Sequence, residues 1–166
     1  PQIQFSFYKK MDSLLATHSI HRIFFLGDLF HSARNAEWDR FVKWNQQCSI
    51  PAYLIKGNHD ILSQELLAES GLEVVDEWRE EGLLLSHHPK EQTGFFNLCG
   101  HLHPGVRMQG KGRQRLKIPC FFHRPNQMIL PAFGDFTGLF ILQPKANDQV
   151  YALGEKSVLP ISLRKK

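Results

Sequence analysis

The sequence has too few cysteines for a disulfide-stapled protein, and its apolar runs are too short for a membrane-spanning one. Its three cysteines, Cys48, Cys99 and Cys120, cannot all pair, and their wide spacing does not resemble a disulfide framework. No apolar run approaches the ~20 residues that a membrane-spanning helix needs. The apolar stretch 5–8 is too short, and its flanks too polar, for a signal peptide. We therefore expect a cytoplasmic protein without membrane association.

The chain also lacks internal repeats, low-complexity tracts and linkers. Apolar residues make up 42% of its 166 residues, which is enough for one sizeable core and too many for a disordered chain. Its formal net charge of +4 suits a polyanionic partner without requiring one. We expect one domain over residues 1–166.

Four short apolar runs are each followed by side chains of the kind that bind metal ions. The runs and the residues that follow them are 23–26 with Asp28, 52–55 with Asn58 and His59, 83–86 with His87 and His88, and 96–99 with His101 and His103. Runs of this length are typical of buried strands in a parallel sheet, where ligands bind at the carboxyl ends. The pattern predicts that these side chains converge at one edge of one sheet.

The rest of the chain predicts helices in its first part and antiparallel strands in its second. Helices are expected over 3–18, over 36–47 with Asn35 as the N-cap, and over 64–69 with Ser63 as the N-cap. Further strands are expected over 72–75, 78–80, 106–109, 115–118, 127–130, 138–142 and 150–153. This order predicts an α/β (α+β) fold with two packed mixed β-sheets flanked by helices.

The residues after the four runs form a mixed oxygen and nitrogen ligand set. A carboxylate, a carboxamide and several imidazoles suit divalent ions such as Mn²⁺, Fe²⁺ and Zn²⁺. Glycine precedes Asp28, Asn58 and His101, which lets the backbone turn sharply and approach an ion. Two ions ~3.5–4 Å apart can activate a bridging water and hold a phosphoryl group. Asp28 can bridge two ions through its two oxygens, whereas His59 is free to face a substrate.

These motifs, in this order, resemble those of the calcineurin-like metallophosphoesterase superfamily. They are Gly27-Asp28, Gly57-Asn58-His59-Asp60, the strand-terminal His87 and Gly100-His101-Leu102-His103. Stretches 25–32, 35–38 and 130–138 more narrowly resemble the bacterial DNA ligase-associated metallophosphoesterases. The resemblance implies a metallophosphoesterase-type sandwich that hydrolyses phosphodiesters or nucleotides by metal-activated water attack. It also implies a DNA repair or nucleic-acid processing setting, with association with a DNA ligase and a helicase.

The resemblance implies a set of metal ligands. Asp28 would bridge both ions, and His103 would belong to the second. The residues that would complete the first site are Asn58, His87 and His101. Of the neighbours His87 and His88, we expect His87 to be the ligand, because it follows the strand directly.

The resemblance also implies residues that act on the substrate. His59 would be the catalytic histidine that stabilises the phosphoryl transition state or protonates the leaving oxygen. Relatives often carry a carboxylate in the loop after Gly-Asp that orients this histidine, but here His31 holds that place. Asp60 is therefore a candidate for orienting His59, and His31 and Asn35 are candidates for contacting the substrate.

One superfamily motif is absent. An Asp-x-His pair on an earlier strand supplies two ligands to the second ion, and no Asp-x-His occurs in these 166 residues. Because the chain opens on Pro1, we expect an N-terminally truncated domain that lacks the first strand or strands. We expect two divalent ions in the complete protein, with Mn²⁺ as the first choice and Fe²⁺ or Zn²⁺ as alternatives. The chain as it stands is expected to bind at most one ion tightly and to show little turnover.

Three other interpretations stay open at this point. A DNA-processing nuclease is the nearest, since repair nucleases share the Gly-Asp-Leu-Phe stretch at 27–30. A catalytically impaired relative that binds nucleic acid is the second, through the basic hairpin residues Lys111, Arg113, Arg115 and Lys117. A structural zinc site is the third, built from Cys99, His101, His103 and Cys120, although Cys99 would lie within an apolar strand.

Overall fold

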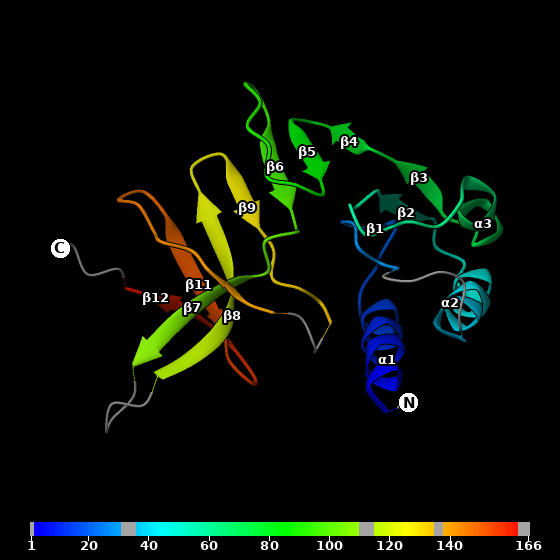
Figure 1. Cartoon of the computed structure of the whole chain (residues 1–166), viewed down its shortest axis with the longest axis horizontal. Helices are drawn as coiled ribbons and strands as arrows, with labels where there is room; N and C mark the ends of the chain where they lie inside the picture. Colours follow the sequence, from blue (N-terminus) through cyan, green and yellow to red (C-terminus); the bar gives the residue numbers. More distant parts are fainter. Residues whose placement is uncertain (1, 31–35, 110–114, 135–137, 163–166) are drawn as a thin grey trace. The chain divides into compact units, whose positions relative to one another are not determined.

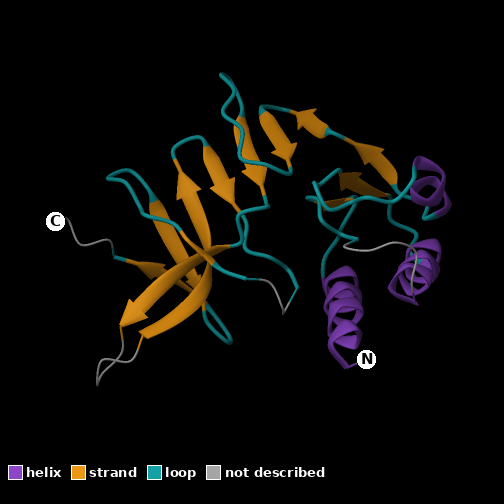
Figure 2. Ribbon diagram, viewed as in Figure 1, coloured by secondary structure: helices purple, strands orange, loops and turns teal. Residues whose placement is uncertain are grey.

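The computed structural model describes residues 2–30, 36–109, 115–134 and 138–162. The chain divides into two compact units, Pro1–Trp78 and Arg79–Lys166 (Figure 1). All the helices of the described residues belong to the first unit (Figure 2). None of these helices is long and apolar enough to cross a membrane.

The first unit is a parallel three-stranded sheet with helices between its strands. Its elements in chain order are α1 (Gln2–Thr17), β1 (Ile23–Phe25), α2 (Ala36–Gln47), β2 (Ala52–Ile55), α3 (Gln64–Glu69) and β3 (Glu73–Val75). The strand order is β1-β2-β3, and both pairings are parallel. Parallel pairing places the ends of β1 and β2 at the same edge, where the Asp28 and Asn58 motifs follow.

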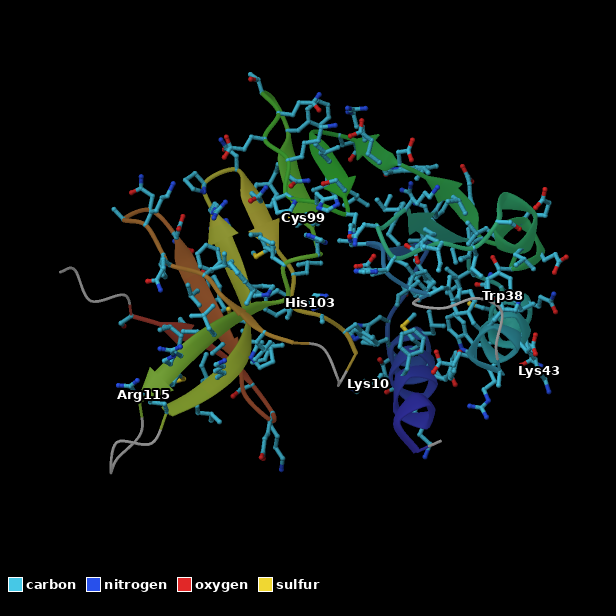
Figure 3. The ribbon with its side chains drawn as sticks, viewed as in Figure 1. Lys10, Trp38, Lys43, Cys99, His103 and Arg115 are labelled. Carbon is cyan, nitrogen blue, oxygen red and sulfur yellow. The ribbon has the colours of Figure 1, made fainter. Side chains whose placement is uncertain are left out.

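Aromatic residues of α2 build the core of the first unit. Trp38 and Phe41 are each 2% exposed, and both face Phe30 in edge-on ring contacts (Figure 3 labels Trp38). Leu54 of β2 is fully buried in the same cluster. The loop after β1 is therefore anchored to the core through Phe30, two residues beyond Asp28.

The second unit is built from strands. They are β5 (Leu83–Ser86), β6 (Phe96–Cys99), β7 (Pro104–Gln109), β8 (Arg115–Arg124), β9 (Gln127–Ile129), β10 (Phe140–Ile141), β11 (Gln149–Leu153) and β12 (Val158–Ile161), and the boundary between the units falls within β4 (Glu77–Glu80). The order is β10-β7-β8-β9-β6-β5-β4, with β11 paired to both β8 and β12. Pairings β5–β6, β6–β9 and β7–β10 are parallel, whereas β8 pairs antiparallel with β7, β9 and β11.

The four apolar runs are strands as predicted, but they do not share one sheet. β1 and β2 lie in the three-stranded sheet, whereas β5 and β6 lie in the nine-stranded sheet. Strand partners are set by long-range pairing, which an apolar run does not encode: β2 pairs with β1 and β3, whereas β5 pairs with β4 and β6. The prediction of one shared sheet edge is therefore wrong, and each sheet carries its own group of candidate ligands.

Candidate metal centre

The carboxylate of Asp60 holds the loop that carries Asp28. Asp60 is only 3% exposed. Its Oδ2 accepts the backbone N–H groups of Asp28 and Gly57, both at 2.8 Å, and its Oδ1 accepts that of Phe30 at 3.0 Å. Three N–H bonds to one buried carboxylate fix the backbone on both sides of Asp28, since charge-assisted bonds of this kind are strong.

Asp28 is turned toward the loop that follows β2. Its backbone has a left-handed φ of 55°, and its Oδ1 accepts the backbone N–H of His59 at 2.9 Å. A Cβ at Gly57 would collide with the backbone nitrogen and Oδ1 of Asp28, so only glycine fits there. The imidazole of His59 and the carboxamide of Asn58 are both exposed. The first unit thus brings Asp28, Asn58 and His59 to one sheet edge.

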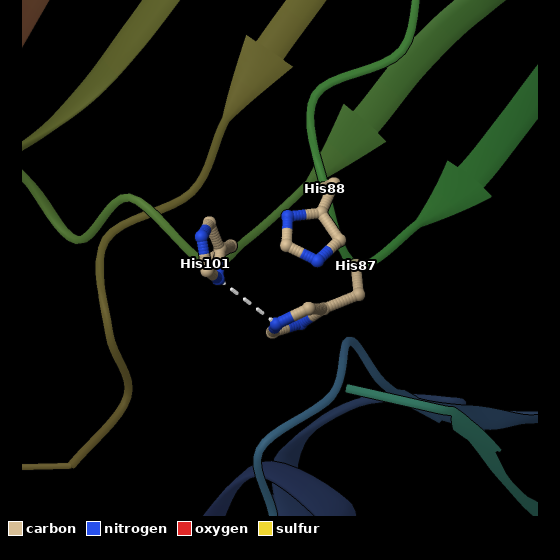
Figure 4. A group of neighbouring side chains, drawn as sticks. All are labelled: His87, His88 and His101. Carbon is tan, nitrogen blue, oxygen red and sulfur yellow. Dashed lines mark hydrogen bonds between the residues drawn. The ribbon is translucent and has the colours of Figure 1, made fainter. Parts of the chain in front are cut away.

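Three histidines gather at the ends of β5 and β6 in the second unit. The ring nitrogens of His87, His88 and His101 that could bind an ion lie within 4.8 Å of one another. His101 Nδ1 is 3.1 Å from His87 Nε2 (Figure 4). His87 is buried at 3% exposure, whereas His88 is exposed. Because β5 and β6 are parallel, both histidine segments leave the sheet at the same edge.

The spacing of these nitrogens fits a divalent ion. A histidine nitrogen lies about 2.0–2.1 Å from a bound zinc ion, so neighbouring ligand nitrogens on one ion are about 3 Å apart. The 3.1 Å between His87 and His101 meets that requirement. His88 adds a third imidazole, with its ring centroid 4.0 Å from that of His101. The three imidazoles therefore fit a metal ion. Their spacing does not distinguish His87 from His88 as the ligand.

The Gly-His-x-His turn has a strained backbone at both histidines. His101 and His103 have φ values of 64° and 44°, a region that non-glycine residues rarely adopt. The Gly100 N–H donates to the His87 carbonyl at 3.1 Å, which ties the two histidine segments together. His103 lies outside the three-histidine group within the described residues. Left-handed residues of this kind concentrate at functional sites, where the surrounding structure holds them.

Residues 4–135 match the family model of the calcineurin-like phosphoesterases. The chain belongs to this family. It is therefore a hydrolase of phosphoesters, in a family that generally depends on two metal ions.

A solved structure of a nuclease has the same fold. The crystal structure of the Pseudomonas putida nuclease MPE is 31% identical and matches with a TM-score of 0.81 over 95% of this chain and 78% of that one. The predicted fold class, mixed α/β with two sheets flanked by helices, is confirmed by this match. No curated protein sequence matches the chain.

A buried polar network supports the histidine cluster of this phosphoesterase. Asn97, 1% exposed on β6, donates to Ser86 Oγ at 2.8 Å and accepts from Gln127 Nε2 at 2.9 Å and from the Lys90 N–H at 3.0 Å. Ser86 in turn donates to the His88 carbonyl at 2.7 Å. Sequence reasoning missed this network, although Asn97 and Ser86 are polar interruptions of two otherwise apolar strands.

The cysteines of this phosphoesterase are core residues. Cys99 and Cys120 are fully buried, and burial raises the pKa of their thiols to about 12 and about 11. Metal ligation requires the thiolate, which this environment disfavours. Within the described residues, no cysteine belongs to a group that could hold an ion. The alternative of a structural zinc site on Cys99 and Cys120 is therefore not supported.

Some predicted residues fall where no structure is described. These are the candidate substrate contacts His31 and Asn35, and the hairpin residues Lys111 and Arg113. Asp60 is predicted to orient His59. In the structure, its carboxylate accepts hydrogen bonds from three backbone N–H groups. Its effect on His59 stays a prediction.

Proposed function

We propose that this phosphoesterase hydrolyses phosphodiester bonds in nucleic acids or nucleotides, in a DNA repair or processing setting. The support is threefold: membership of the family, the nuclease named in the solved structure, and the stretches that resemble DNA ligase-associated metallophosphoesterases. The same resemblance supports a functional association with a DNA ligase and a helicase. The three widely spaced cysteines support a cytoplasmic location. Between a nuclease and a phosphodiesterase of small substrates, the named nuclease favours the former.

The proposed ligand set spans the motifs at both sheet edges. The residues that would hold the first ion are Asp28, Asn58, His87 and His101, with Asp28 and His103 on the second. The observation that carries the proposal is the 3.1 Å spacing of His87 Nε2 and His101 Nδ1, which suits two ligands of one ion. Mn²⁺ is the proposed ion, since a mixed carboxylate, amide and imidazole set suits it.

Each motif residue has a defined task in this proposal. When bound, the ions would polarise the phosphoryl oxygens and lower the pKa of a water. Asp60 and Gly57 keep Asp28 in place for binding. The backbone of His59 is fixed by its bond to Asp28 Oδ1. Its exposed imidazole would then donate a proton or a hydrogen bond to a phosphoryl or leaving oxygen.

The test is an assay of the full-length gene product on three substrates. Bis(p-nitrophenyl) phosphate, p-nitrophenyl phosphate and a single-stranded oligonucleotide are each incubated with Mn²⁺ and with EDTA. We expect hydrolysis of the diester and the oligonucleotide with Mn²⁺, its loss in EDTA, and its loss in Asp28→Asn. Hydrolysis of the monoester alone, or activity that survives EDTA, would contradict the proposal.

A further inference from the structure

Positive charge is concentrated in the second unit. Residues 79–166 hold 13 basic and 6 acidic residues, a formal net charge of +7, whereas residues 1–78 hold 7 basic and 10 acidic residues, a net charge of −3. The stretch 104–124, which contains β7 and β8, has no acidic residue. Its six basic residues are Arg107, Lys111, Arg113, Arg115, Lys117 and Arg124. This is the electrostatic pattern of a polyanion-binding surface.

The pairing of β7 with β8 places three of these cations on one face. Arg107 is directly opposite Lys117, and Gln109 is opposite Arg115, so the three basic side chains share that face. All three are exposed, and Arg115 lies at the end of the ribbon where β7 ends and β8 begins (Figure 3). Directly opposed residues have Cβ atoms about 5 Å apart, and like charges at that spacing repel.

Nothing in the described part of the chain neutralises these three cations. None of their side chains has a hydrogen bond or an ion pair there, so the repulsion between Arg107 and Lys117 is not offset within those residues. A ligand with regularly spaced negative charges would offset it. The sugar–phosphate backbone of a nucleic acid is such a ligand.

Aromatic rings continue the same face away from the cations. Alternation along β8 puts Phe121 on the side of Lys117, while Cys120 and Phe122 face the core. Tyr151 of β11 is directly opposite Phe121, so the two rings neighbour each other on this outer face. Both are half-buried, and the Tyr151 hydroxyl donates to Gln149 Oε1 at 2.6 Å. Rings held in this way offer flat surfaces to unpaired bases.

We propose that this outer face, defined by Arg107, Arg115, Lys117, Phe121 and Tyr151, binds single-stranded nucleic acid. The cations would contact successive phosphates, and the two rings would stack with bases, which is how strand-binding sheets hold unpaired nucleic acid. A duplex buries its bases, so it gains only the phosphate contacts. The inference rests on the proposed function for the class of its ligand, and adds a surface that holds the substrate strand.

The charge part is tested by fluorescence anisotropy with a labelled oligothymidylate in EDTA, which prevents hydrolysis. The variant Arg107→Gln/Arg115→Gln/Lys117→Gln is compared with Lys43→Gln/Lys145→Gln/Lys156→Gln, which removes three exposed lysines elsewhere. Losing three phosphate contacts should lower the salt slope by about 2 and weaken binding about 100-fold near 0.1 M salt. The control should keep the wild-type slope. Equal losses of affinity in both variants would mean that net charge alone determines binding, and would overturn the proposal.

The aromatic part is tested with Tyr151→Ala, with Tyr151→Phe as the matched control that keeps the ring. Stacking of one base predicts a loss of about 5- to 150-fold for single strands in Tyr151→Ala and none in Tyr151→Phe. Affinity for a duplex of the same length should be unchanged in both. Thermal unfolding of each variant checks that the sheet remains folded. A loss that is equal for duplex and single strand overturns the stacking assignment.

The binding tests and the hydrolysis tests can refute the two proposals separately. Binding that needs the face but leads to no Mn²⁺-dependent cleavage would contradict the proposed function and leave the surface in place. Cleavage with no effect of either face variant on binding would overturn the surface and leave the function in place. Binding of anionic phospholipid vesicles with higher affinity than the oligonucleotide would also overturn the assignment of the ligand.

Discussion

The Asp60 carboxylate fixes the backbone around Asp28, a task that its position in the sequence does not indicate. Its Oδ2 accepts two N–H groups and its Oδ1 a third, so replacing one oxygen with an amide NH₂ leaves at least one buried N–H unpaired. Asp60→Asn should therefore lower the free energy of unfolding by about 2–4 kcal/mol, measured by urea denaturation. The control is Asp148→Asn, since its buried carboxylate accepts one backbone N–H, that of Lys145. An Asp60 effect no larger than the control's would contradict this account.

Gly57 is required for a different reason, the close approach of Asp28. Gly57→Ala introduces a Cβ into the backbone nitrogen and Oδ1 of Asp28, so we expect a cost of about 1–3 kcal/mol in unfolding free energy. Mn²⁺ affinity should fall with it, since the carboxylate must move. Gly134→Ala is the matched control because a Cβ there meets nothing within 4 Å. Calorimetric titration that finds unchanged Mn²⁺ binding in Gly57→Ala would show that Asp28 is not a ligand.

His59 is predicted to act on the substrate rather than on the ion. His59→Ala in the full-length gene product should reduce turnover about 10²- to 10⁴-fold, while the bound metal measured by elemental analysis stays nearly the same. The backbone bond from His59 to Asp28 does not depend on the side chain, so the ligand geometry should survive the substitution. Metal lost in proportion to activity would mean that His59 is a ligand.

At the scale of elements, β6 and β8 bury two thiols that must stay protonated. The folded pKa values, about 12 for Cys99 and about 11 for Cys120, lie above the ordinary value of 9.0. Above pH 9 the unfolded chain releases these protons while the folded chain keeps them, so stability falls as pH rises. The expected slope between pH 9 and 11 approaches about 1.4 kcal/mol per pH unit for each thiol.

Urea denaturation across this range measures that slope. The double variant Cys99→Ala/Cys120→Ala should start from a lower stability, because it loses packing in the core, but should have a shallower pH dependence. Tyr8, whose pKa is raised by burial and then by Glu37, contributes in the same direction in both proteins and cancels in the comparison. Identical slopes would rule out the thiols as the source.

Elements with strong local signals could be predicted from the sequence. The helices 36–47 and 64–69 and the strands 52–55, 83–86 and 96–99 have the predicted bounds, because apolar periodicity and the Ser63 cap specify them locally. The exposed strand β12 was missed, since most of its side chains face solvent and show no alternation. The separation of the four runs into two sheets could not be predicted, because it depends on which strand edges are free.

For the whole molecule, the sequence predicts which motifs form the site better than it predicts the bonds that hold them in position. The sequence identified the histidine motifs that the structure gathers, because each follows an apolar strand. It did not identify the tasks of Asp60 and Asn97, since both act through bonds to groups distant along the chain. The excess of basic residues in the proposed face is evident from the sequence, but the arrangement of these residues on one face depends on the register of β7 and β8.

The proposed ligand set assigns Asp28 and the histidine motifs to one ion. Calorimetric titration of Mn²⁺ into the 166-residue chain tests it most directly, in the wild type, Asp28→Ala and His101→Ala, with the exposed Asp76→Ala and His18→Ala as controls. We expect one tightly bound ion. In both site variants, Mn²⁺ affinity should fall by more than the about 10- to 100-fold that changing a residue outside the ligand set costs. The controls should bind as the wild type does. Loss of the ion in His101→Ala with full binding in Asp28→Ala would contradict the shared site, since the histidines would then hold it alone.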